Sequence, residues 1–217
     1  MASPRRYLAY GSNLQLEQMA RRCPNSSYLG LGTLAHYRWQ INQRGFANIV
    51  PAKEDDEIQG LVYEIDAVDE ARLDLNEGVA TRAYQKRFLP VLLRRAAPDL
   101  YRRPVAWVVG KGGINTVLGS VQAPVPPTLE HDVLVYLSLD HVCDSEPRSE
   151  YVRRMNLGIA DARWLGLDQG YILRAIRPFI PESDGERTGE RTGERTGERT
   201  GLSSGPPTTT NASGNGP

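Results

Sequence analysis

The chain has 217 residues, of which 40% are hydrophobic, and its 26 basic residues balance 26 acidic ones to a formal net charge of 0. This balance gives no overall attraction to nucleic acid, and the apolar content is sufficient for one globular domain with a core. No apolar stretch has the length of a membrane span, and the residues before Tyr7 do not form a signal-peptide core. We therefore expect a cytoplasmic protein that binds neither nucleic acid nor membrane.

The last part of the chain differs in composition from the rest. Four Glu-Arg-Thr-Gly repeats follow Gly185, and Ser, Thr, Pro and Gly dominate the remaining residues. Such a segment buries too little apolar surface to offset the entropy lost on ordering it. The sequence therefore predicts a folded domain over residues 4–182 and a disordered low-complexity tail over residues 183–217.

The first half of the domain is predicted to be rich in strands. Residues 7–10 have the pattern of a short buried strand, and residues 14–22 form a helix that Pro24 stops. Asp66 is placed to cap a second helix, which runs through Leu75. Three segments between these helices have the β-branched and aromatic content of strands: 37–42, 48–52 and 60–65.

The second half of the domain contains most of the predicted helical residues. A helical region begins at Pro147 and ends near Gly166, and a short helix follows over residues 168–177. Because strands dominate early and helices late, the pattern predicts a mixed α+β domain and not regular βαβ winding. The pattern itself does not show whether the strands close into a barrel. Further strands are predicted over 84–93, 105–109 and 133–139.

The segment Tyr10-Gly11-Ser12-Asn13-Leu14 joins the first predicted strand to the first helix. A helix N-terminus has free backbone N–H groups, which favour an anion such as a carboxylate, and Gly11 lets a ligand approach the backbone closely. Ser12 and Gln15 have the spacing of a capping box. The alternative interpretation is an ordinary capped helix with no ligand.

The second informative segment places Glu77 just beyond the predicted helix that ends near Leu75. Gly78 can supply the left-handed residue that stops this helix. A carboxylate at the negative end of the helix dipole has its ionised form disfavoured, and if it is also partly buried its pKa rises toward the range of a general acid and base. The alternative is a solvent-exposed glutamate with no role.

Taken together, these segments resemble the γ-glutamylcyclotransferase family. Residues 10–14 are similar to its Tyr-Gly-Ser-Asn-Leu signature, Asn76-Glu77-Gly78-Val79 to the segment with its catalytic glutamate, and residues 147–151 to a later segment that ends in a pocket tyrosine. The resemblance implies a small mixed β-barrel flanked by helices, with no cofactor and no metal. It implies Glu77 as the catalytic residue and the following substrate-binding residues: Tyr10, Gly11, Ser12, Asn13, Leu14, Tyr84 and Tyr151.

The resemblance also implies a reaction, the release of 5-oxoproline from a γ-glutamyl amide by attack of the substrate's own α-amine. The substrate supplies the nucleophile, so the protein needs only a base for the α-ammonium and an acid for the departing amine. Glu77 can serve as both. The substrate could be a γ-glutamyl amino acid, glutathione or a glutathione-derived specialised metabolite, and the sequence leaves the oligomeric state open, a homodimer included.

Other interpretations remain open at this stage. One is a non-catalytic member of the same fold that binds a small carboxylate or a partner protein. Another is a serine hydrolase with Ser12 as nucleophile, although the sequence lacks Gly-x-Ser-x-Gly. Residues 94–130 are longer than the family's minimal connection, and we expect either an edge-strand excursion or a lid there. This insertion leaves the identity of the leaving group open.

Overall fold

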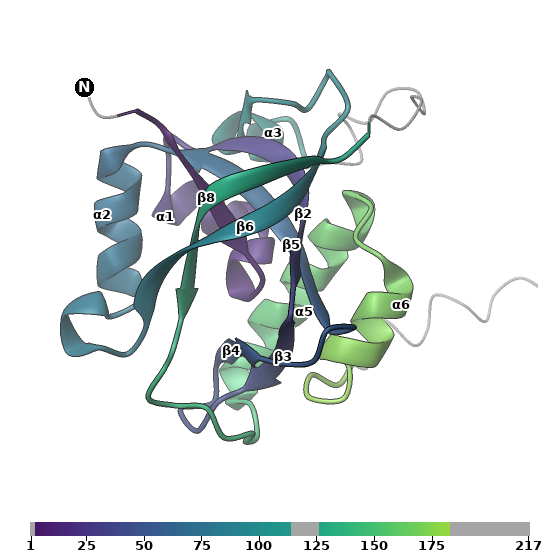
Figure 1. Ribbon diagram of the computed structural model, residues 1–217. Coiled ribbons are helices and arrows are strands. Elements are labelled where there is room, and N and C mark those ends of the chain that lie inside the picture. Colours follow the sequence, from purple (N-terminus) through teal and green to yellow (C-terminus); the bar gives the residue numbers. More distant parts are fainter. Residues whose placement is uncertain (1–2, 114–125, 183–217) are drawn as a thin grey trace, which may run out of the picture. The chain divides into compact units, whose positions relative to one another are not determined.

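The computed structural model describes residues 3–113 and 126–182, and the centre of the fold is a closed β-barrel (Figure 1). The strand order is β5-β1-β8-β6-β2, and β2 also pairs with β5, which closes the ring. All of these pairings are antiparallel except that of β1 with β8. The barrel strands are β1 (Arg5–Ala9), β2 (Ser27–Ala35), β5 (Glu57–Ile65), β6 (Gln85–Arg95) and β8 (Thr128–Leu137).

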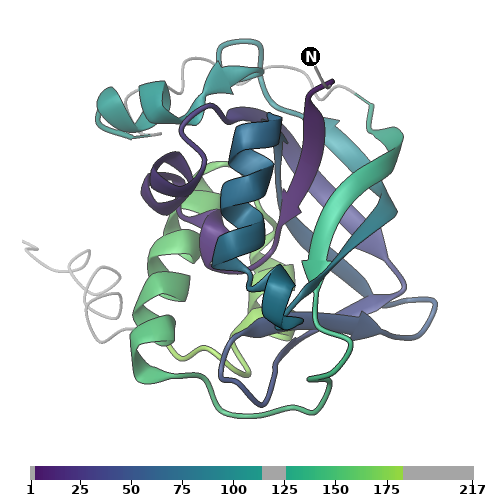
Figure 2. The ribbon, with the colours of Figure 1, turned by 90° about the vertical axis from the view of Figure 1, so that its left-hand side faces the viewer.

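The remaining elements lie around this barrel. The hairpin β3 (Tyr37–Ile41) and β4 (Ala47–Pro51) forms a separate two-stranded sheet, and the short β7 (Arg103–Pro104) pairs with β2. Figures 1 and 2 show α1 and α2 side by side against the outside of the barrel. The helical segments are η1 (Ser12–Leu14), α1 (Leu16–Arg22), α2 (Ala67–Asn76), η2 (Val79–Thr81), α3 (Val105–Gly110), α5 (Ser149–Trp164), α6 (Gln169–Tyr171) and η3 (Ile172–Ile176).

The arrangement confirms the predicted α+β class and the small barrel flanked by helices. The predicted strands at 7–10, 37–42, 48–52, 60–65, 84–93 and 133–139 each overlap an observed strand. The predicted C-terminal tail, 183–217, lies outside the described residues, as do residues 114–125 of the predicted insertion. No helix within 3–113 and 126–182 is long and apolar enough to cross a membrane.

The predicted strand at 105–109 is wrong, because these residues form α3. Val105 and Val108 are buried while Ala106 and Trp107 are exposed, a spacing of three that suits a helix and not the alternation of a strand. The β-branched valines favoured a strand locally, but packing against α1 determined the outcome.

Strand β2 is the main element that the sequence pattern did not indicate. It contains Gly30 and Gly32, and glycine in a strand interior weakens the pattern. The fold explains both residues. A Cβ on Gly30, whose φ is +149°, would lie 2.1 Å from the carbonyl oxygen of Arg94. A Cβ on Gly32 would come within 2.9 Å of side chains of Val62, Leu8 and Val91 inside the barrel.

We expect Gly30→Ala to destabilise the fold by about 3 kcal/mol or more, because the new methyl group must displace the backbone of β6 and a φ of +149° strains an L-residue. Urea unfolding followed by circular dichroism measures this loss. Gly110→Ala is the matched control, since a Cβ there meets nothing within 4 Å and alanine favours the helix by up to about 1 kcal/mol. Equal free energies of unfolding for the two variants would contradict the close approach of β2 to β6 at Gly30.

Candidate active site

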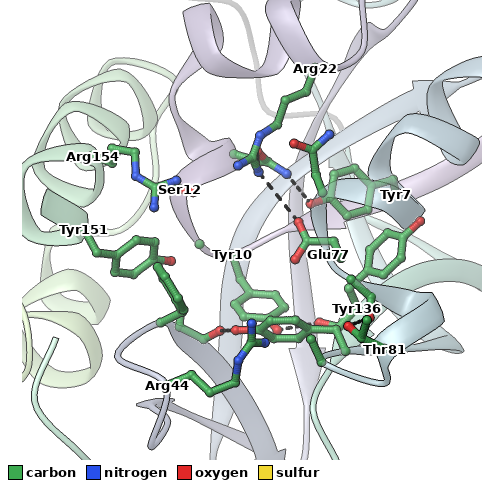
Figure 3. Close-up of a pocket in the computed structure, with 18 residues that line it drawn as sticks. Tyr7, Tyr10, Ser12, Arg22, Arg44, Glu77, Thr81, Tyr136, Tyr151 and Arg154 are labelled. Atoms are coloured by element: carbon green, nitrogen blue, oxygen red, sulfur yellow. Dashed lines mark hydrogen bonds and ion pairs between the residues drawn. The ribbon is translucent and has the colours of Figure 1, made fainter. Parts of the chain in front are cut away.

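A cavity of about 260 Å³ lies where several distant parts of the chain meet, and it is slightly smaller than the usual ligand pocket (Figure 3). These parts include the loop after β1, the end of α2, the β3–β4 turn and the N-terminal half of α5. The residues that line it are Tyr7, Tyr10, Gly11, Ser12, Asn13, Arg22, Arg44, Phe46, Ala47, Asn76, Glu77, Gly78, Thr81, Ala83, Tyr84, Tyr136, Tyr151 and Arg154.

Most residues singled out from the sequence meet at this cavity. Leu14 is the exception, because its side chain is fully buried in the core. It packs against Gly158 of α5, where an added Cβ would lie 3.0 Å from Leu14 Cβ. Leu14 therefore anchors the loop and does not face the cavity. The sequence-predicted residues that do line it are Tyr10, Gly11, Ser12, Asn13, Glu77, Tyr84 and Tyr151.

Glu77 is held at the C-terminal end of α2 by local chemistry that the sequence indicated. Asp66 caps the start of this helix by accepting a hydrogen bond from the Asp69 N–H at 2.8 Å. Glu77 is the C-cap, and its N–H donates to the Leu73 carbonyl at 2.8 Å. Gly78 then takes the predicted left-handed conformation, with φ of +65°, and turns the chain away.

Burial dominates the electrostatics of the Glu77 carboxyl. Its side chain is only 18% exposed, and burial raises its pKa above the ordinary value for glutamate. Arg22 opposes this effect, with Nη1 3.7 Å from Glu77 Oε1, and Arg154 and Arg44 oppose it further. The direction of the shift agrees with the sequence prediction, and the partial burial on which that prediction depended is its main cause. The result is a carboxyl suited to both accepting and donating a proton.

The loop from Gly11 to Leu14 differs from the predicted helix start. Its last three residues form the 3₁₀ turn η1, and the capping box of Ser12 with Gln15 is wrong. Ser12 Oγ instead accepts a hydrogen bond from Gln18 Nε2 at 2.8 Å. The N–H of Leu16, at the start of α1, donates to the Asp161 carboxylate of α5 at 2.8 Å. The N-terminus of α1 is thus occupied by a side chain of the protein.

Asn13 links the loop to the carboxyl side of the cavity. Its Oδ1 accepts from Gln18 Nε2 and from Arg22 Nη1, both at 2.9 Å. Its Nδ2 donates to the Tyr7 hydroxyl at 2.9 Å. Because Arg22 also faces Glu77, the same guanidinium orients the loop and the carboxylate. Tyr7 and Arg22 lie in this network without any sequence motif that marked them.

Tyr151 closes the other side of the loop. A Cβ on Gly11 would lie 2.9 Å from the Tyr151 hydroxyl, which explains the need for glycine there. Burial raises the pKa of Tyr151 to about 12, while the backbone N–H groups of Ala47 and Ser12 that face its oxygen lower it. The Tyr151 oxygen therefore accepts from the backbone, and its own proton is available to the cavity.

The other cavity tyrosines differ in whether their hydroxyl protons are engaged. The Tyr10 hydroxyl donates to the Tyr136 carbonyl, the Tyr84 hydroxyl donates to the Ala47 carbonyl at 2.7 Å, and the Tyr136 hydroxyl donates to the Asp74 carboxylate at 2.7 Å. These three hydroxyls help to fix the walls. Tyr7 and Tyr151 are the cavity tyrosines for which no acceptor occurs within the described residues.

Three arginines reach the cavity, and the sequence motifs marked none of them. Arg22 faces Glu77, while Arg154 forms two 2.9 Å hydrogen bonds with the Glu150 carboxylate. Figure 3 shows Glu77 between Arg22 and Arg44, with Arg154 and Tyr151 on the side of Ser12. Arg154 could have been found from its spacing, because it follows Tyr151 by three residues on one helix face. Arg44 comes from a turn, and periodicity does not apply there.

Comparison with known proteins places this geometry in a family. The family model described as "Gamma-glutamyl cyclotransferase, AIG2-like" matches residues 7–122. The chain belongs to this family. The matched range contains the loop at 10–14, Glu77 and Tyr84 but ends before Tyr151 and Arg154, so the contribution of α5 to the site rests on the structure. No curated protein matches the chain.

Solved structures support the same fold at low sequence identity. A structure described as gamma-glutamyl cyclotransferase is 19% identical, with a TM-score of 0.54, and the match covers 88% of this chain and 93% of the other. The uncharacterized protein loc79017 from Homo sapiens is 18% identical, with a TM-score of 0.53 and coverage of 84% and 91%. YkqA from Bacillus subtilis is 18% identical, with a TM-score of 0.51 and coverage of 73% and 49%.

We expect the Glu77 carboxyl to titrate above the ordinary range of glutamate, because burial disfavours its charged form. Arg22→Gln should raise this pKa further, since the guanidinium that favours the ionised form is removed. ¹³C NMR of protein labelled at glutamate carboxyls measures both values, with Glu77→Gln used to assign the resonance. An unshifted Glu77, or a lower pKa in Arg22→Gln, would contradict the electrostatic description given above.

Proposed function

We propose that this protein is a γ-glutamyl amide cyclotransferase that releases 5-oxoproline and a free amine. The observation that carries the proposal is the Glu77 carboxyl, buried beside a small cavity with a raised pKa and facing Arg22. Family membership supports the reaction class, and residues 10–13 of the loop face the same cavity as Glu77.

The reaction needs one group that moves a proton twice. Free α-amino groups titrate near about 7.7 to 8, so much of the substrate arrives as the α-ammonium. Glu77 accepts a proton from it, and the freed amine attacks the γ-carbonyl carbon to form a new C–N bond. Glu77 passes this proton to the amide nitrogen, and the original amide C–N bond then breaks. The ring nitrogen gives up its second proton to the Glu77 carboxylate, which leaves the neutral lactam of 5-oxoproline, and that proton leaves with the departing amine or to water. The raised pKa of Glu77 favours its protonated form, which donates to the departing nitrogen. Arg22 favours the ionised form, which accepts the proton from the α-ammonium.

Binding of the glutamyl chain in a folded conformer supplies the rest of the catalysis. Ring closure is intramolecular, so holding the α-amine against the γ-carbonyl contributes through orientation. The loop at Gly11 and Asn13, with the neighbouring Arg154, is suited to the α-carboxylate, while the Ser12 N–H faces the Tyr151 oxygen. Tyr10 and Tyr84 shape the wall, and Leu14 holds the loop in place from within the core.

The developing oxyanion needs a hydrogen-bond donor that is already in position. The hydroxyl protons of Tyr10, Tyr84 and Tyr136 are directed to protein acceptors. Within the described part of the chain, the hydroxyl protons of Tyr7 and Tyr151 have no protein acceptor. Both residues line the cavity. We assign oxyanion stabilisation to these two hydroxyls. The substrate class within this proposal is a γ-glutamyl amino acid, glutathione or a glutathione-derived metabolite.

Glu77→Gln should lower the rate of 5-oxoproline release by about 10²- to 10⁴-fold, the usual contribution of a general acid and base. The protein should still fold, because a neutral amide avoids the cost of burying a charge. The assay incubates wild type and variant with γ-glutamyl amino acids and glutathione and quantifies 5-oxoproline by mass spectrometry.

Glu54→Gln is the matched control for this experiment, since Glu54 is exposed and does not line the cavity. It should retain the wild-type rate. Equal product from wild type and Glu77→Gln would remove Glu77 from the mechanism. Binding of γ-glutamyl compounds by wild type without product would instead favour a small-carboxylate-binding protein of the same fold.

Ser12→Ala should retain most of the activity, within about tenfold of wild type, because the Ser12 hydroxyl accepts from Gln18 and the backbone faces the ligand. No histidine lines the cavity in the described residues, so Ser12 has no adjacent base of the kind a serine nucleophile needs. The same 5-oxoproline assay measures the effect. A loss as large as that of Glu77→Gln, together with a trapped acyl-enzyme, would favour a serine hydrolase.

A further inference from the structure

Arg44 differs from the other two arginines of the cavity in having no carboxylate in ion-pair contact within the described residues, because its charge acts on Glu77 only at longer range. Its Nη1 is buried and makes no hydrogen bond, and its side chain forms no ion pair within the described residues. Figure 3 shows its guanidinium directed toward the cavity. A buried guanidinium nitrogen left unpaired is costly, because the lost hydration is not replaced. A ligand that supplies an anion at this position would remove that cost.

The Arg44 side chain is held in place by its surroundings. Its guanidinium carbon lies 5.8 Å from the ring centroids of both Phe46 and Tyr84, a distance typical of cation–π contacts. These two rings orient the stem and the head of the side chain. The guanidinium is therefore positioned before any ligand arrives, which reduces the entropy lost on binding.

The turn that carries Arg44 is also fixed by specific hydrogen bonds. Asn42 Oδ1 accepts from the Arg44 N–H at 3.0 Å, and Arg148 Nε donates to the Arg44 carbonyl at 2.9 Å. Gly45 has φ of +81°, and a Cβ there would lie 2.6 Å from Arg148 Cγ. The turn is thus built tightly against the segment that begins α5.

The charges that line the cavity favour an anionic ligand. Arg22, Arg44 and Arg154 contribute three positive charges. Against them stand Glu77 in the cavity wall and Glu150, which bonds Arg154, so one positive charge remains in excess. A γ-glutamyl amide with a neutral leaving group carries one carboxylate and one ammonium, so it has no net charge. A leaving group with its own carboxylate adds the anion that this excess favours.

We propose that Arg44 binds a carboxylate on the leaving group of the substrate, so that the enzyme selects γ-glutamyl amides of amino acids or peptides over those of simple amines. This inference rests on the function proposed above. In the proposed binding mode the α-carboxylate of the glutamyl moiety lies near Arg154 and the loop at Ser12. Arg44 lies on another wall of the cavity, and Glu77 separates it from Arg22 in Figure 3. The second carboxylate is therefore the one left for Arg44.

The test compares two ligands that differ only in the carboxylate, γ-glutamyl-alanine and γ-glutamyl-ethylamide. Calorimetry on Glu77→Gln measures binding without turnover. We expect γ-glutamyl-alanine to bind about 10- to 150-fold more tightly, the range for a hydrogen bond to a charged group. Adding Arg44→Gln should remove most of this difference by weakening γ-glutamyl-alanine, with γ-glutamyl-ethylamide changed by no more than about twofold.

Two further variants keep the test sharp. Arg44→Met retains an apolar stem for Phe46 and Tyr84 and should behave as Arg44→Gln does if the latter folds poorly. Arg87→Gln removes one positive charge from an exposed position outside the cavity and should leave both affinities unchanged. Thermal unfolding of each variant checks that the fold is intact.

The outcomes separate this inference from the proposed function. Equal affinities for the two ligands, equal weakening of both by Arg44→Gln, or no binding of either ligand would overturn the role of Arg44. Equal weakening would instead assign Arg44 to the glutamyl moiety common to both ligands. If the Arg44-dependent difference in binding persists but wild type releases no 5-oxoproline, the proposed reaction fails and the carboxylate site stands.

Discussion

The pairing of β2 with both β5 and β6 is the constraint on which the rest of the structure depends. It closes the barrel, and it leaves no room for a side chain at Gly30, which meets the backbone at the end of β6, or at Gly32, which meets side chains of the barrel interior. Closure fixes where β1 ends and where β5 passes into α2. The loop at Gly11 and the carboxylate at Glu77 are thereby set on the same cavity, although 65 residues separate them in the chain.

Helix α5 completes the site from outside the barrel. Gly158 allows it to approach Leu14, and Asp161 accepts the first N–H of α1, so the helix and the loop hold each other. The same face of α5 carries Tyr151 and Arg154 into the cavity. The packing of α5 against the loop therefore positions the loop together with Tyr151 and Arg154, which face it. A site supported in this way on rigid elements is held in a fixed geometry.

The burial that raises the pKa of Glu77 also lowers the stability of the folded protein at higher pH. A folded-state pKa above the unfolded value means that ionising this carboxyl costs more in the folded protein, so its contribution to stability is lost as pH rises through the interval between the two values. Arg22 limits this loss by favouring the charged form. A buried acid that lowers stability in this way is characteristic of functional sites, which accords with the role proposed for Glu77.

Local chemistry in the sequence determined the helix that ends at Glu77, the left-handed Gly78, the turn after β1 and most of the strands, because caps, glycine turns and β-branched runs act over a few neighbours. Tertiary structure alone decided the helix at Val105–Gly110, the strand containing Gly30 and Gly32, and the replacement of the Ser12 cap by Asp161. It also decided that Arg22, Arg44 and Arg154 converge on one cavity. These outcomes depend on contacts between residues far apart in the chain, and such contacts leave no periodic or short-range pattern for the sequence to display.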